Sequence, residues 1–72
     1  MTPSTLRQLW ATVESTQSAT LLQLDDHHLV NVLIDTVTTN HSLTDPEIEE
    51  LGDYIHSRIA LIRDLATSRC AA

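Results

Sequence analysis

The chain contains no lysine. Four arginines stand against ten acidic residues, which gives a net charge of −6 over 72 residues. A nucleic-acid-binding protein needs a basic stripe that neutralises phosphates, and an anionic membrane surface attracts basic segments for the same reason. We therefore expect no nucleic-acid partner and no membrane partner for this chain.

Long apolar runs and cysteine pairs are also missing. The longest unbroken apolar run spans residues 59–62, far short of the roughly 20 residues that cross a bilayer. No apolar signal core follows Arg7, and the single Cys70 can form no internal disulfide, which fits a reducing compartment. These features predict a cytoplasmic protein.

Catalytic motifs are absent as well. Gly52 is the only glycine, so the chain holds neither a glycine-rich phosphate loop nor a Gly-x-Ser-x-Gly elbow. Small helical chains seldom enclose a pocket large enough for catalysis. We expect a non-enzymatic protein without a cofactor, in which Gly52 lets a neighbouring helix approach closely.

The histidines do not have the spacing of a metal site. Helical sites use ligands three or four residues apart, whereas His27 and His28 are adjacent and His41 and His56 lie alone. The acidic run from Asp45 does not match a calcium loop, which needs glycine at its sixth position. We expect no metal site from local spacing, which leaves open a site assembled across helices or chains.

Apolar residues make up 42% of the chain and recur with helical periodicity in three segments. We predict an all-α fold for a single domain over residues 1–72, with helices at about 3–17, 26–39 and 45–67 and a frayed tail at 68–72. Thr2 and Pro3 form a typical helix start. Because Leu21 and Leu24 continue the first apolar stripe, one helix reaching residue 24 is an alternative.

Asp25 is a good N-cap for the second segment, which could also be a strand because β-branched residues alternate from Val30 to Thr36. We favour the helix, since a lone strand has no sheet to join. The third segment opens on a capping box formed by Thr44 and Glu47. The short connection before it predicts that the second and third helices form an antiparallel hairpin.

The third predicted helix is apolar on more than one side. Tyr54, Leu61 and Leu65 lie off its main stripe, and two short helices cannot cover all of it. A chain of this length buries only a small hydrophobic core, and small domains often gain stability by forming oligomers. We therefore predict a homodimeric helical bundle that also binds another protein, with an interface that contains Tyr54, Leu61, Leu65 and the single tryptophan, Trp10. The alternatives are an obligate partner of another sequence and a compact three-helix monomer that leaves a few aliphatic side chains exposed.

Two classes of function agree with these features. The first is a non-enzymatic protein–protein interaction module, such as a small regulator, adaptor or assembly factor, that acts through helix surfaces. The second is an acidic inhibitor that occupies a basic site on a nucleic-acid-binding protein. Its docking surface would be the acids at the start of the third helix, namely Asp45, Glu47, Glu49, Glu50 and Asp53.

Overall fold

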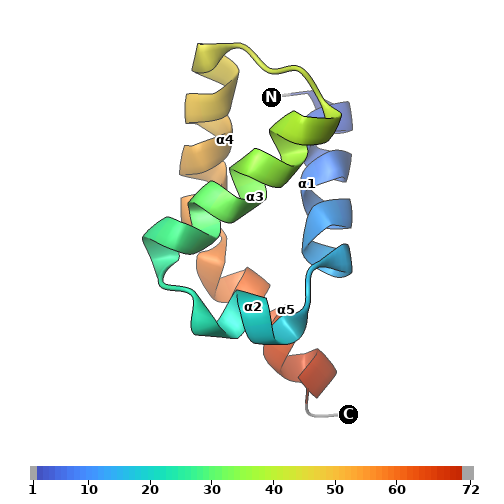
Figure 1. Ribbon diagram of the computed structural model, residues 1–72, viewed down its shortest axis with the longest axis vertical. Coiled ribbons are helices and arrows are strands. Elements are labelled where there is room, and N and C mark those ends of the chain that lie inside the picture. The colour runs from blue at the N-terminus through green and yellow to red at the C-terminus, as the bar shows by residue number, and fades with distance from the viewer. Residues whose placement is uncertain (1, 71–72) are drawn as a thin grey trace.

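The computed structural model describes residues 2–70, which form five helices and no strand (Figure 1). The helices are α1 (Pro3–Ser15), α2 (Ser18–Gln23), α3 (Asp26–Asn40), α4 (Asp45–Ser57) and α5 (Ile59–Cys70). The all-helical class is confirmed, but the predicted number of three helices is wrong. Within residues 2–70, no helix combines the length and the apolar composition that crossing a membrane requires.

The first correction concerns the end of α1, which lies at Ser15, two residues before the predicted end near 17, so the alternative of one helix reaching residue 24 is wrong. The hydroxyls of Thr12 and Thr16 donate to the carbonyls of Gln8 and Thr12 at 2.7 and 2.6 Å, and Thr16 has an extended backbone. Side chains that bond to backbone carbonyls weaken a helix. The chain therefore leaves α1 after Ser15 and starts the separate helix α2 at Ser18.

The second correction concerns the predicted helix 45–67, which is two helices separated by Arg58. In an unbroken helix the Arg58 N–H would bond to the Tyr54 carbonyl. Here the Ser57 hydroxyl donates to that carbonyl at 2.7 Å, and the Arg58 N–H bonds to Ile55 O at 2.9 Å. A side chain inserted into the backbone ladder bends a helix without proline or glycine. α5 then continues to Cys70, so residues 68–70 of the predicted frayed tail are helical, and 71–72 lie outside the described residues.

The hairpin of α3 and α4 has the predicted short connection, residues 41–44, and the two helices run in opposite directions (Figure 1). α3 is a helix and not a strand, and Asp25 caps it by accepting from the His28 N–H at 2.8 Å. A Cβ added to Gly52 would lie 3.3 Å from Ile34 Cδ1. The glycine therefore permits the close approach of α3 that the sequence predicted.

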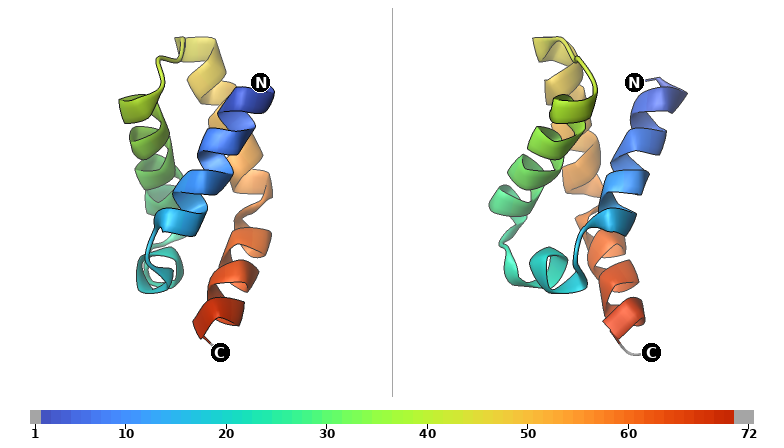
Figure 2. Two further views of the ribbon diagram at one scale, coloured as in Figure 1. Left: turned by 90° about the vertical axis from the view of Figure 1, so that its right-hand side faces the viewer. Right: turned by 45° about the vertical axis from the view of Figure 1, so that its right-hand side comes forward.

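One core joins all five helices. α1 packs against α3, and α5 packs chiefly against α2, so that α5 lies beneath α1 rather than beside α4 (Figure 2). The molecule measures 37 × 20 × 18 Å. Its fully buried large side chains come from every helix: Leu9, Leu21, Leu29, Leu33, Val37, Leu51, Ile55 and Ile62.

Two carboxylates cap helices through bonds that favour their charged form. The His28 N–H holds the pKa of Asp25 below its ordinary value. The Thr44 N–H and hydroxyl, which donate to Glu47 Oε1 at 3.1 and 2.9 Å, likewise lower the pKa of Glu47. A carboxyl with a lower pKa in the folded than in the unfolded state stabilises the fold above its unfolded pKa. That stabilisation disappears as the pH falls through the folded-state pKa.

We expect the free energy of unfolding to fall as the pH drops below about 4, the range in which Asp and Glu titrate. The double variant Asp25→Asn with Glu47→Gln removes both titrating groups and keeps side chains that can accept the same bonds. Its stability should therefore change less with acid than that of the wild type. Urea denaturation between about pH 6 and pH 3 measures both slopes, and parallel slopes would show that these caps do not drive the acid response.

Candidate protein-interaction surface

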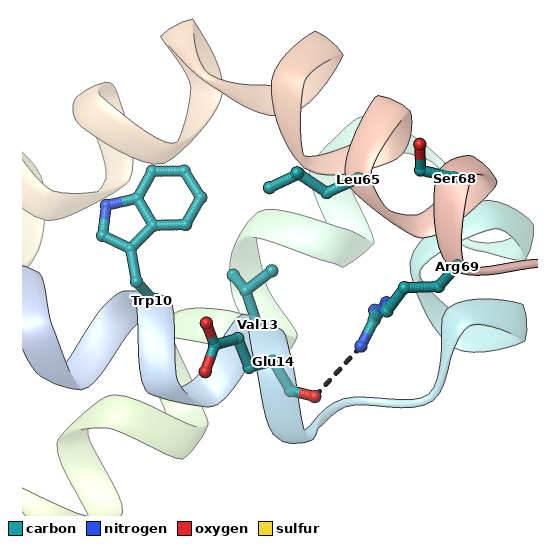
Figure 3. Close-up of a pocket in the computed structure, with 6 residues that line it drawn as sticks. All are labelled: Trp10, Val13, Glu14, Leu65, Ser68 and Arg69. Atoms are coloured by element: carbon teal, nitrogen blue, oxygen red, sulfur yellow. Dashed lines mark hydrogen bonds between the residues drawn. The ribbon is translucent and has the colours of Figure 1, made fainter.

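An open pocket of about 340 Å³ lies between α1 and α5 (Figure 3). Trp10 and Leu65 face one another across it, and the buried Val13 forms its floor. The sides are completed by Glu14, Ser68 and Arg69. The lining is thus mainly apolar, with charged groups at one end.

Trp10 connects this pocket to α4. Its ring meets the edge of the Tyr54 ring at a centroid distance of 6.4 Å and an interplanar angle of 83°, a favourable aromatic geometry. The Arg58 guanidinium lies 5.1 Å from the Tyr54 ring centroid, within the range of a cation–π contact. Trp10 and Tyr54 are both half-buried, so each ring contacts the core and also faces water.

Leu61 and Leu65 are the most exposed large apolar residues described, at 46% and 44%. They are exposed because α5 directs Ile62 and Ala66 into the core, which leaves the other side of the helix uncovered. Since Leu61 and Leu65 are four residues apart, they share one face of α5. We call Trp10, Tyr54, Leu61 and Leu65 the α1–α5 face. All four residues were predicted as interface residues. The structure brings Trp10 together with Tyr54 and with Leu65, and Leu61 lies one turn before Leu65 on α5.

Arg69 fixes the charged end of the pocket. Its guanidinium donates to the carbonyl oxygens of Glu14 at 3.0 Å and Thr16 at 3.4 Å, at the C-terminal end of α1 (Figure 3). A cation at that end of a helix complements the partial negative charge of its last carbonyls. The Glu14 carboxylate points away from the guanidinium, so the attachment of α5 to α1 depends on backbone acceptors.

Arg63 attaches α5 to α2 in the same way. Its guanidinium donates to the carbonyls of Leu21 at 2.9 Å and Leu24 at 2.8 Å and to Asp26 Oδ1 at 2.9 Å. Sequence reasoning predicted no partner for Arg63 or Arg69 on another helix. It missed both contacts because a backbone carbonyl about 40 or more residues away in the chain leaves no mark in the sequence.

The predicted acidic docking surface lies on the first three turns of α4, and only part of it is available to a partner. Glu47 is half-buried and accepts the bonds of the Thr44 cap. Asp45, Glu49 and Asp53 are exposed and recur every four residues, which places them along one side of α4. Glu50 is exposed as well.

His27 and His28 take part in side-chain hydrogen bonds at the start of α3. His28 Nδ1 lies 2.8 Å from Asp25 Oδ1, and His27 Nε2 lies 3.3 Å from the side-chain nitrogen of Asn31. Across residues 2–70, no three His, Cys, Asp or Glu side chains are grouped so that they could hold a metal ion.

The α1–α5 face is therefore the feature whose shape and chemistry suit the binding of another molecule. Comparison of the chain with protein-family models, with curated proteins and with solved structures finds no match.

Proposed function

We propose that this chain is a non-enzymatic protein–protein interaction module whose binding surface is the α1–α5 face. The observation that carries the proposal is the exposure of Leu61 and Leu65, at 46% and 44%, beside the open pocket of Trp10. Full burial of a leucine side chain contributes about 1.5–3 kcal/mol. Aromatic residues next to such aliphatic groups are typical of binding hot spots.

A second copy of the chain is the partner that suits the charge of this face. Arg58 lies over the Tyr54 ring, and Arg69 lines the pocket beside Glu14. Two of the four arginines are therefore at this face, which lowers the repulsion between two copies of a chain with a net charge of −6. In a two-fold interface each contact also occurs twice, so a small patch is effective.

Light scattering tests the proposal directly. The wild type should have twice the monomer mass of 8.0 kDa at about 100 μM, roughly a hundredfold above a micromolar Kd. Leu61→Glu with Leu65→Glu should have the monomer mass and keep its helical circular dichroism, because both side chains lie outside the core.

A matched control places the same two charges elsewhere. Leu22 and Val32 are exposed at 38% and 37% on α2 and α3, and Leu22→Glu with Val32→Glu should leave the dimer intact. A monomeric wild type at this concentration, or equal loss of mass in both double variants, would contradict the proposal.

The competing function is that of an acidic inhibitor of a basic site, and the exposed acids Asp45, Glu49 and Asp53 favour it. The salt dependence of association distinguishes the two functions, because salt weakens contacts between charged groups and leaves apolar contacts in place. Self-association through the α1–α5 face should persist or strengthen between about 0.05 and 0.5 M salt, since screening also reduces the repulsion between two acidic chains. Association that disappears as salt is added would favour the acidic surface.

A further inference from the structure

The junction between α4 and α5 is a single residue in a sequence that suits one unbroken helix. No glycine or proline lies between Tyr54 and Cys70. The buried residues of both helices follow one helical stripe: Leu51, Ile55, Ile59, Ile62 and Ala66. At this junction the Ser57 hydroxyl donates to Tyr54 O and the Arg58 N–H is shifted to Ile55 O, which interrupts the bonding of a straight helix. Such a helix, from Asp45 to Cys70, would be roughly 39 Å long.

The contacts that hold α5 in place come from segments far away in the chain. Arg63 bonds to the carbonyls of α2, and Arg69 bonds to those at the end of α1. The apolar side of α5 packs chiefly on α2. A second copy of the chain presents identical acceptors and an identical apolar surface, so α5 can make the same contacts with either copy.

We infer that two copies of this chain exchange α5, an inference that rests on the proposed self-association. In the exchange, α4 and α5 straighten at Arg58, and each α5 packs on α1 and α2 of the partner. The Ser57 hydroxyl leaves Tyr54 O, and the Arg58 N–H moves from Ile55 O to Tyr54 O. Every other contact of α5 is re-formed between chains. The free-energy cost of the exchange is therefore confined to the rearranged junction and to the association of the two chains.

The straight helix also creates a new contact between the copies. Tyr54, Arg58, Leu61 and Leu65 then follow one another at intervals of four, three and four residues, which is the spacing of one helix face. Two such helices that pass in opposite directions bury these faces against each other. The acids at the start of α4 in one copy then lie beside the arginine-bearing half of the other, which compensates charge.

Isotope-filtered NMR on mixed dimers tests the exchange. Labelled and unlabelled chains are unfolded together, refolded, and examined for contacts between the methyl groups of α2 and those of α5. Leu21 of α2 and Ile62 of α5 are fully buried in one core, and the two helices pack together, so a dimer formed only by surface contact keeps these contacts within one chain. Cross-peaks between labelled and unlabelled chains are the expected result. A dimer with cross-peaks only within chains would overturn the exchange and leave the proposed function standing, whereas a monomeric wild type would overturn both.

Variants of Arg58 give a second test that does not depend on the α1–α5 face. Arg58→Gly disfavours helix at the junction, which is helical only in the exchanged form, and each dimer contains two junctions. It should weaken dimerisation roughly tenfold or more relative to Arg58→Ala. Both variants lose the same guanidinium, so the comparison isolates the backbone. Equal dimer dissociation constants for the two variants would overturn the inference.

Discussion

Leu21→Ala is expected to lower the free energy of unfolding by about 2–5 kcal/mol. Leu21 is fully buried and is the one buried residue of the six-residue helix α2. Truncation removes apolar contacts and leaves a cavity where α2 packs on α5. The total stability of a domain this size is about 4–11 kcal/mol, so the variant loses a large share of it. A shift of the urea midpoint, with the helical signal followed by circular dichroism, measures the change.

The neighbouring residue supplies the control. Leu22 is in the same helix and is exposed at 38%, so Leu22→Ala makes the same chemical change without opening a cavity. We expect it to alter the free energy of unfolding by less than about 1 kcal/mol. Equal effects of the two variants would mean that α2 does not pack into the core in the observed orientation.

Arg63→Met is expected to lower the free energy of unfolding by about 2–3 kcal/mol. The variant keeps the aliphatic stem but removes every donor to the carbonyls of Leu21 and Leu24. The Arg63 side chain is 25% exposed, so water replaces those bonds only in part. Arg63→Lys should recover a fraction of the loss, because an ammonium group lacks the planar fork that reaches several acceptors. Urea denaturation measures each variant.

Two further variants show which bonds matter. Asp26 is 59% exposed, and Asp26→Asn should change stability by less than about 0.5 kcal/mol, since exposed ion pairs contribute little. Arg7→Met removes an exposed guanidinium of α1 that has no hydrogen bond or ion pair with any residue from 2 to 70, and it should have no measurable effect. A loss in Asp26→Asn equal to that in Arg63→Met would assign the stabilisation to the ion pair instead of the carbonyls.

The sequence by itself determined where α1, α3 and α4 begin and which sides of the helices are buried. Asp25 caps α3 and Thr44 opens α4 as predicted, because a cap joins residues only three apart and its signal is therefore local. The apolar stripe through Leu51, Ile55 and Ile62 was likewise readable, since burial follows helical periodicity. The same periodicity identified Leu61 and Leu65 as residues outside the main stripe.

Only the tertiary structure decided where the helices end and how α5 is attached. Thr16 and Ser57 each lie in a segment whose apolar pattern favours a continuing helix. In the folded chain their hydroxyls bond to backbone carbonyls where the chain turns, and these turns allow α2 to pack on α5. The positions of Arg63 and Arg69 depend on carbonyl groups, which every residue possesses, so no side-chain pattern could reveal their partners. The contact between the Trp10 and Tyr54 rings, which lie far apart in the chain, was likewise decided by the fold and not by local sequence.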